Sequence, residues 1–458
     1  MKILTKFAIA SLTLTLCAQS TWAQTKLDTA ERTEVLKRIG RALEERYVFP
    51  ELGTSCRTYL QNAAEAGVFE QDDDPIAFAS HLTKELQRIT KDGHMRVRHR
   101  AARLMRERRD DPAAARARRL RQMRERNYGI QSVTRLDGNI GYLDLRAFVG
   151  MEGAATRAAA AMCLLHGADA IIVDLRRNGG GSPDMVQFLC SYFFAEKTHL
   201  NSLYWREGNT TKEYWTLDDL PGPRMADVPL FVLTSSRTFS AAEEFTYNLK
   251  TRKRATAVGE TTGGGANPGG MVPVGKRFGI FVPTGRAINP ITKTNWEGTG
   301  IEPDIACEAD DALATALRQA RKEAVGYRST KAAREQQQME AVKVQLAAID
   351  TMAKNKQWSE ASVAVAKVLE LATESGLWSE GAANELGYSY LTRGDVEIAI
   401  AAFTFNVKAH PSSSNCYDSL GEAYMAAGDT KRGIANYKRA VELDSSNDAA
   451  RRIIEKHK

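Results

Sequence analysis

The chain has 458 residues, too many for one ordinary domain and enough for two to four units of roughly 150 residues each. Hydrophobic residues make up 43% and charged residues 26%, and these ordinary globular values exclude collagen-like, wholly disordered and multi-span membrane classes. The formal net charge of +7 is unevenly distributed, because 13 arginines lie between Arg96 and Arg126.

The first 23 residues have the three-part layout of a secretory signal peptide. Lys2 and Lys6 precede an apolar stretch over 7–18, and small residues precede Gln24, so cleavage is expected after Ala23. The apolar stretch is shorter than the roughly 20 residues that span a bilayer. The sequence therefore predicts an exported protein, periplasmic or secreted, whose mature chain has no transmembrane segment.

Residues 24–94 have apolar positions at helical spacing and lack strand-like runs, which predicts an N-terminal helical domain. The arginine-rich segment over 95–127 has almost no aromatic residues and so lacks stacking platforms for single-stranded nucleic acid. We interpret it as a solvated helix or connector, with an electrostatic collar near an active site as the alternative. No nucleic-acid partner is expected.

Residues 128–325 alternate strand and helix signals, which predicts an α/β domain with a mainly parallel sheet covered on both faces. The expected strands are 139–145, 170–175, 229–234 and 278–282, and the expected helices are 154–166 and 186–194. Five cysteines remain in the mature chain, widely spread and without metal-like pairing. We expect buried apolar thiols, with one disulfide as the alternative.

After a polar linker at 326–340, residues 341–458 become helical and repeat with a period of 34 residues. Leu386-Gly387 recurs as Leu420-Gly421, and Phe403 corresponds to Tyr437. This pattern resembles the tetratricopeptide repeat, in which stacked helix pairs bury a shared core. It implies an all-α C-terminal domain that could bind a protein partner.

Ser240 follows an expected buried strand and a short turn, at the start of an expected helix. Ser240 with Glu243 fits a helix capping box, which is the structural explanation. The same position suits a nucleophile, because the N–H groups at a helix start can receive a developing oxyanion. The serine alone does not decide between the two explanations.

A serine nucleophile needs a base and a group that orients the base. His94 lies in a turn-like context, where a lone histidine is also commonly a plain surface residue. Glu297 is a candidate orienting carboxylate, although spacing alone does not select it over Glu243, Glu244 or Glu260. The glycine run around Gly180 follows a strand and can bring N–H groups close to a carbonyl, or be only a tight turn.

Together these residues resemble the S41 serine peptidases, which include tail-specific processing proteases, tricorn protease and the repeats of interphotoreceptor retinoid-binding protein. The segments that carry the resemblance occur in the family's order: 91–94, 141–143, 174–181, 234–243, 259–264 and 297–304. The resemblance implies Ser240 as nucleophile, His94 as general base, Glu297 as orienting carboxylate, and an oxyanion hole formed by the N–H groups of Gly180 and Ala241.

The resemblance also implies a spiral β/α fold like that of the Clp-protease and crotonase families, over 128–325. No lysine lies in 263–265, so a histidine base of the tricorn-like kind is implied, although Gly93 stands where that branch has a hydroxyl residue. The segment from His94 to Ile140 is too short for the PDZ domain of the tail-processing branch.

We expect protein or peptide substrates and no cofactor or metal. The alternatives are a non-catalytic binding protein for apolar ligands or peptides, and an envelope scaffold acting through its repeats.

Overall fold

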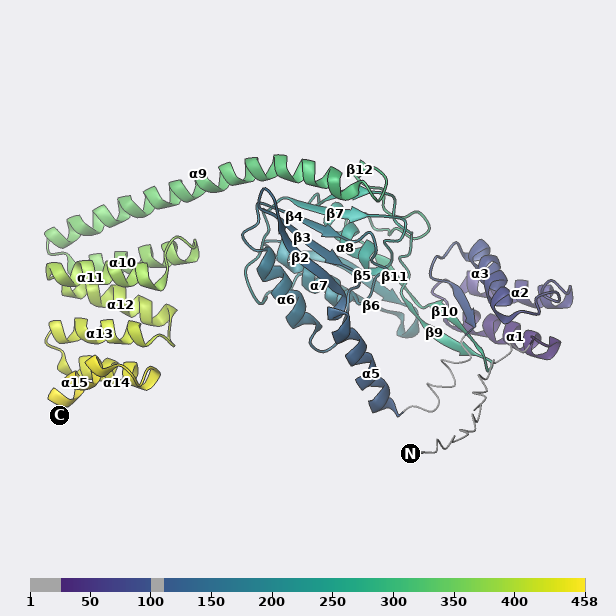
Figure 1. The fold of residues 1–458 in the computed structure, drawn as a ribbon, viewed down its shortest axis with the longest axis horizontal. Coiled ribbons are helices and arrows are strands. Elements are labelled where there is room, and N and C mark those ends of the chain that lie inside the picture. Colours follow the sequence, from purple (N-terminus) through teal and green to yellow (C-terminus); the bar gives the residue numbers. More distant parts are fainter. Residues whose placement is uncertain (1–25, 100–110, 458) are drawn as a thin grey trace, which may run out of the picture. The chain divides into compact units, whose positions relative to one another are not determined.

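The computed structural model describes residues 26–99 and 111–457, and the predicted signal peptide at 1–23 lies outside them (Figure 1). The chain divides into two compact units, Met1–Tyr327 and Arg328–Lys458. Within the described ranges, no helix is long and apolar enough to cross a membrane.

Three amphipathic helices form the N-terminal part of the first unit. Asp28 and Asp74 cap the first and third of them, each accepting a hydrogen bond from an N–H group of the first turn. The apolar faces form one core with a three-stranded antiparallel sheet of order β1-β10-β9. The elements are α1 (Thr29–Arg46), α2 (Pro50–Glu65), α3 (Pro75–Thr90), β1 (Arg96–His99), β9 (Gly269–Val274) and β10 (Phe278–Pro283).

A six-stranded sheet of order β12-β8-β7-β4-β3-β2 forms the central body, and only the β2–β3 pair is antiparallel. In the middle strand β4, Ile171 and Val173 pack in a core that includes residues of α6, α7 and α8, while Ala170 and Ile172 pack in a second core with the start of α9. Both faces of the sheet are therefore covered. Its strands are β2 (Ile130–Leu136), β3 (Ile140–Leu145), β4 (Ala170–Asp174), β7 (Leu230–Thr234), β8 (Thr256–Gly259) and β12 (Ile305–Ala306).

The remaining elements of this unit cover the sheet or extend it. The helices are α5 (Pro112–Glu125), α6 (Ala154–Leu165), α7 (Pro183–Cys190) and α8 (Ala241–Lys250), with 3-10 turns η1 (Asn127–Gly129), η2 (Ser191–Phe193) and η3 (Glu207–Asn209). A third sheet, antiparallel and of order β11-β5-β6, contains β5 (His199–Trp205), β6 (Thr210–Trp215) and β11 (Gly285–Ile288).

The second unit is all-helical. The equivalent positions of the 34-residue pattern make equivalent contacts: a Cβ added at Gly387 would lie 2.4 Å from the Phe403 ring, and one at Gly421 would lie 3.2 Å from the Tyr437 ring. The helices are α9 (Ala312–Lys354), α10 (Trp358–Glu374), α11 (Glu380–Arg393), α12 (Val396–Ala409), α13 (Ser414–Ala426), α14 (Thr430–Leu443) and α15 (Asp448–Lys456), of which α9 begins in the first unit.

The predicted fold class is confirmed: helices at the N-terminus, a central mixed α/β body and an all-α C-terminal region. The segment 326–340, expected to be a linker, is part of the continuous helix α9, because its Ala, Arg, Gln and Lys residues are good helix formers. The arginine-rich helix α5 has no buried residue, as expected for a solvated helix.

The cysteines follow the prediction in part. All five cysteines among the described residues are free, and Cys56, Cys190 and Cys416 are buried. Cys163 is exposed, and Cys307 is half-buried. The expectation of buried thiols is therefore wrong for Cys163, which lies near the end of α6 on its outer side.

Candidate active site

Ser240 occupies the sharp turn between the end of β7 and the start of α8. Its φ of +56° and ψ of −122° are rare for a residue with a side chain. Such a conformation costs on the order of 1–3 kcal/mol and persists only where the surrounding structure enforces it. The chain here runs strand, turn, helix, which is the arrangement that exposes a nucleophile at the start of a helix.

Glu243 is one of the groups that enforce this turn. Its fully buried carboxylate accepts a hydrogen bond from the Ser240 N–H at 2.8 Å, as in a capping box. It also accepts from the N–H groups of Gly264 at 2.7 Å and Gly265 at 2.9 Å. Burial raises its pKa, and these donors oppose the rise. Glu243 thus ties the serine turn to the glycine loop that follows β8.

The glycine turn after β4 packs directly against Ser240. Gly180 has a φ of +104°, and a Cβ added there would lie 2.7 Å from the Ser240 Cβ. The Gly180 N–H donates to Asn178 Oδ1 at 2.8 Å, whereas the Gly181 N–H has no acceptor among the described residues. The Ala241 N–H belongs to the first turn of α8, where N–H groups have no partner within the helix.

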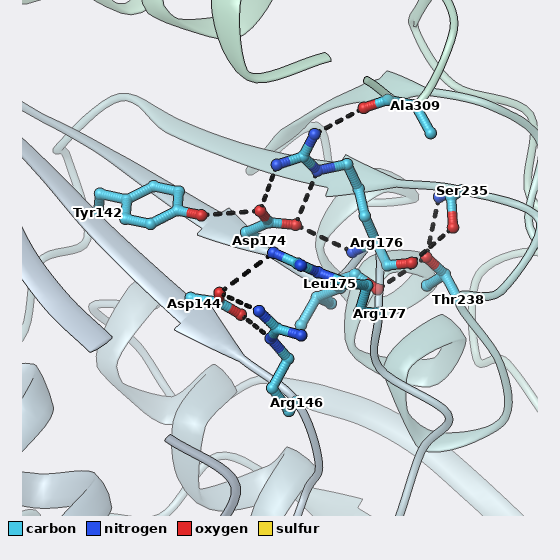
Figure 2. Close-up of polar contacts among 10 residues, drawn as sticks. All are labelled: Tyr142, Asp144, Arg146, Asp174, Leu175, Arg176, Arg177, Ser235, Thr238 and Ala309. Carbon is cyan, nitrogen blue, oxygen red and sulfur yellow. Dashed lines mark hydrogen bonds and ion pairs between the residues drawn. The ribbon is translucent and has the colours of Figure 1, made fainter. Parts of the chain in front are cut away.

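A polar network at the carboxyl ends of β3 and β4 holds these turns (Figure 2). The guanidinium of Arg176 makes a forked pair with Asp174, with bonds of 2.6 and 3.0 Å, and also donates to the Ala309 carbonyl at 2.6 Å. Tyr142 donates to Asp174 at 2.8 Å. Because the pair is largely buried and fully hydrogen-bonded, it fixes where the glycine turn leaves the sheet.

The serine turn is fixed to the same strand end through Thr238 (Figure 2). The buried Thr238 hydroxyl donates to the Leu175 carbonyl and accepts from the Ser235 N–H, both at 2.9 Å. The Ser235 hydroxyl donates to the Arg176 carbonyl at 2.6 Å. The two turns that flank the candidate nucleophile therefore form one hydrogen-bonded unit.

His94 comes from the turn between α3 and β1. Its ring lies between two phenylalanine rings, with centroid distances of 4.6 Å to Phe239 and 5.5 Å to Phe281. Burial and the positive charge of Arg96 lower its pKa to about 4, so the imidazole is neutral at pH 7. Its Nδ1 is buried and has no hydrogen-bond partner in the described structure.

Glu297 holds the turn that carries His94. One carboxylate oxygen accepts from the Gly93 N–H at 2.9 Å, and the other accepts from the N–H groups of Ala266 at 2.5 Å and Asn267 at 3.0 Å. Burial and the neighbouring charge of Asp92 raise its pKa to about 7. Glu297 therefore contacts the backbone beside His94 and makes no hydrogen bond to the imidazole ring.

Asp92 is a second buried carboxylate at this position. It accepts from the His94 N–H at 2.9 Å, from Asn267 Nδ2 at 2.9 Å and from the Tyr47 hydroxyl at 3.2 Å. Burial raises its pKa. The candidate ligand atoms of Asp92, His94 and Glu297 lie within 4.8 Å of one another. Every carboxylate oxygen already accepts a hydrogen bond, so the donor set fits a structural clamp better than a metal site.

A cleft of about 680 Å³ joins these groups. Ser240 and His94 both line it, together with Gly179 and Gly181 of the glycine turn. Glu297 lies behind His94 and does not line the cleft. The residues predicted from the sequence, Ser240, Ala241, Gly180, His94 and Glu297, are therefore gathered around one site, but Ser240 and His94 make no hydrogen bond in this structure.

Sequence reasoning missed the supporting residues Glu243, Asp92 and Asn178. Glu243 was considered only as a helix cap or as a rival orienting carboxylate. Its hydrogen bonds to residues 21 and 22 positions away could not be read from local spacing. Asp92 gave a weak signal, since it lies two residues before the candidate base.

Two family models match the chain. The model described as peptidase family S41 matches residues 139–307, and the one described as the N-terminal domain of Peptidase_S41 in eukaryotic IRBP matches residues 28–135. Together they cover more than half of the chain. The chain belongs to peptidase family S41.

Solved structures with a similar fold include three proteases or putative peptidases. The photosystem II D1 C-terminal processing protease is 17% identical, with a TM-score of 0.40, over 61% of this chain and 94% of that chain. A putative peptidase from Parabacteroides merdae is 18% identical, with a TM-score of 0.45, over 64% of this chain and 97% of that chain. Tricorn protease is 12% identical, with a TM-score of 0.41, over 66% of this chain and 37% of that chain. At these sequence identities and TM-scores, the three structures do not bear on the substrate or mechanism of this chain.

One curated relative matches a short stretch. Heat shock protein STI1 of Saccharomyces cerevisiae is 49% identical over 45 residues, which is 10% of this chain. The stretch spans 8% of that protein. The match therefore does not bear on the activity of the whole chain.

Proposed function

We propose that the chain is an exported serine peptidase that hydrolyses peptide bonds through an acyl-enzyme on Ser240. The observation that carries this proposal is the strained conformation of Ser240 at the start of α8, on the wall of the cleft that His94 also lines. A helix cap alone does not need a positive φ, because ordinary N-caps have extended backbone. Membership of family S41 supports the reaction class.

In the proposed reaction, His94 removes the proton from Ser240 Oγ as Oγ bonds to the substrate carbonyl carbon. The same imidazole then gives that proton to the leaving amine as the C–N bond breaks, which leaves an ester on Ser240. A water molecule, deprotonated by His94, attacks the ester, and the proton returns to Oγ. These reaction steps require a neutral His94 imidazole, and the lowered pKa of His94 keeps the imidazole neutral at pH 7.

Glu297 is proposed as a positioning residue. Its bond to the Gly93 N–H fixes the backbone of the His94 turn against residues 266–267. A ring nitrogen of His94 and a carboxylate oxygen of Glu297 lie within 4.8 Å of each other without forming a hydrogen bond. Catalytic contacts of this kind commonly tighten when substrate binds. We propose that substrate closes the cleft and brings His94 to Ser240.

The Ala241 N–H is proposed as one oxyanion donor. Gly180 was the second donor expected from the sequence, but its N–H is engaged by Asn178. The glycine turn can supply the second donor in two ways: Asn178 releases Gly180, or the unpaired Gly181 N–H serves instead. In either case the oxyanion is stabilised by main-chain N–H groups that are already fixed in place.

Export and partner binding complete the proposal. The signal-peptide pattern at 1–23 directs the chain out of the cytoplasm. The repeated contacts of Gly387 with Phe403 and of Gly421 with Tyr437 support tetratricopeptide-like helix pairs over 341–458, which would bind a protein partner.

A non-catalytic binding protein on the same fold is the second candidate. It is favoured by the missing hydrogen bond between Ser240 and His94 and by the low pKa of His94, about 4, which makes the imidazole a weak base. The aromatic walls of the cleft, Phe239 and Phe281, would then contact an apolar ligand.

Labelling with a serine-directed phosphonate probe separates the two candidates. The peptidase proposal expects one covalent adduct on Ser240, lost in Ser240→Ala and strongly reduced in His94→Ala. Ser236 lines the same cleft, so Ser236→Ala is the matched control and should label like the unmodified protein. An unlabelled protein, or a Ser240→Ala variant that labels normally, would exclude Ser240 as the nucleophile.

A further inference from the structure

The cleft beside Ser240 is strongly biased in charge. Among the described residues, three arginines line it, Arg96, Arg98 and Arg237, and no aspartate or glutamate does. The nearby carboxylates, Glu297 and Asp92, are turned to backbone and side-chain donors behind the cleft wall. A cleft lined by one sign of charge concentrates partners of the opposite sign.

Two of these arginines are placed by the register of β1. Side chains alternate along a strand, so Arg96 and Arg98 share one face, while Val97 between them is 5% exposed and packs in the N-terminal core. Arg96 lies opposite Phe281 of β10, and Phe281 lies opposite Met271 of β9. The β1-β10-β9 sheet thus presents an apolar wall whose outer edge carries two positive charges.

No described residue neutralises the charge of Arg98. Its guanidinium has no hydrogen bond or ion pair with any described residue, and Arg96 donates only to the Gly93 carbonyl, at 3.3 Å. The third arginine, Arg237, also lines the cleft and belongs to the serine turn rather than to the β1 strand. The pKa of the Glu260 carboxyl is lowered chiefly by the N–H groups of Ser236 and Ala309, and the nearby charge of Arg237 adds to this, so the charge of Arg237 is offset in part.

We propose that the cleft selects peptide segments with aspartate or glutamate side chains close to the scissile bond, which makes acidic peptides the substrate class. This inference rests on the proposed peptidase function. The apolar surface of Phe239 and Phe281 would contact the substrate backbone and apolar side chains, while Arg98 of β1 and Arg237 of the serine turn would pair with carboxylates near the cut.

Arg96 couples this selection to the reaction. Its positive charge is one of the causes that lower the pKa of His94. A substrate carboxylate that pairs with Arg96 would offset that charge and make His94 a stronger base. Acidic substrates should therefore raise kcat as well as lower KM, whereas a surface that only attracts acidic chains would lower KM alone.

Binding is measured first, with the full-length Ser240→Ala protein, so that the result does not depend on cleavage. The probes are two fluorescein-labelled twelve-residue peptides that differ only in Glu against Gln at four positions, each made with a free and an amidated C-terminus. At 50 mM salt we expect the Glu peptides to bind roughly tenfold more tightly, the combined size of two or three exposed charge pairs. The difference should shrink as salt rises.

The variants Arg98→Gln and Arg237→Gln in this background should each remove part of the preference. Arg116→Gln is the matched control, since Arg116 is an exposed arginine of α5 outside the cleft and should leave the preference unchanged. Equal affinity for Glu and Gln peptides would overturn the inference. A preference that disappears on C-terminal amidation would also overturn it, because the cleft would then recognise a chain end.

Cleavage by the unmodified protein is measured on the same peptides. Cuts next to Glu, with a higher kcat than on the Gln peptides, support both the inference and the peptidase function. Equally efficient cleavage of the Glu and Gln peptides would contradict only the inference that acidic peptides are selected. Tight binding of Glu peptides by a protein that cuts neither peptide supports the charge selection and contradicts the peptidase function.

Discussion

Replacing Gly180 with alanine tests whether the glycine turn positions Ser240. The added Cβ would lie 2.7 Å from the Ser240 Cβ and 2.9 Å from both the Ala241 nitrogen and the Phe239 carbonyl oxygen. Contacts this short are not tolerated, and two of the three atoms are backbone. The substitution must therefore displace the serine turn or the glycine turn.

The expected size of the effect follows from this geometry. A φ of +104° is unfavourable for alanine, which costs about 1–2 kcal/mol, and the steric overlap adds a similar amount. We expect the first unit to melt roughly 4–16 °C lower, at about 2–4 °C per kcal/mol. A displacement of the nucleophile approaching 1 Å should slow phosphonate labelling about 100-fold.

Gly179→Ala is the matched control for stability. A Cβ at Gly179 would meet nothing within 4 Å, and its φ is not in the left-handed region, so the melting temperature should stay within about 1 °C. Labelling of Gly180→Ala at the unmodified rate, with an unchanged melting temperature, would refute the role given to this turn.

Three further changes probe other parts of the account. Because protonation of His94 removes the base and its pKa is lowered to about 4, the acid limb that His94 gives to kcat/KM should lie at about pH 4–5; in Glu297→Gln, where the carboxyl with a pKa of about 7 is absent, an acid limb near pH 6.5 would contradict this environment. Thr238→Val leaves the buried Ser235 N–H without its acceptor, while the Leu175 carbonyl keeps the Asn178 N–H as a donor, and it should cost roughly 1–3 kcal/mol by denaturant unfolding of the first unit, whereas Thr238→Ser should cost much less. Gly387→Ala should lower the melting temperature of the second unit, since its Cβ would lie 2.4 Å from the Phe403 ring, while the exposed Gly381→Ala should raise it slightly; equal effects would argue against that packing.

Much of the fold was predictable because the pattern of apolar residues was strong. The continuous apolar run at 170–174 forms the doubly buried strand β4, and the helix expected after Ser240 begins at Ala241. The two three-stranded sheets were harder to predict. β1 has only four residues, with arginines at 96 and 98, and it becomes a strand because β10, almost 200 positions away, pairs with it. No local signal carries that pairing.

The site residues named from the sequence stay predictions, and their contacts could not be predicted. Ser240, His94 and Glu297 could be selected because they stand in ordered motifs. The structure differs in that Glu297 bonds to the backbone at Gly93, and in that the Gly180 N–H is occupied by Asn178. Such bonds depend on the positions of loops brought together by the fold, and a sequence pattern holds no information on them.

The most direct test of the central claim is to incubate the purified protein with an unstructured protein substrate and to map the new termini by mass spectrometry. We expect cleavage by the unmodified protein and a transient ester on Ser240 that acid quenching captures. We expect no cleavage by the Ser240→Ala variant, whose melting temperature should be unchanged. Cleavage at the same sites and rate by Ser240→Ala would contradict the account.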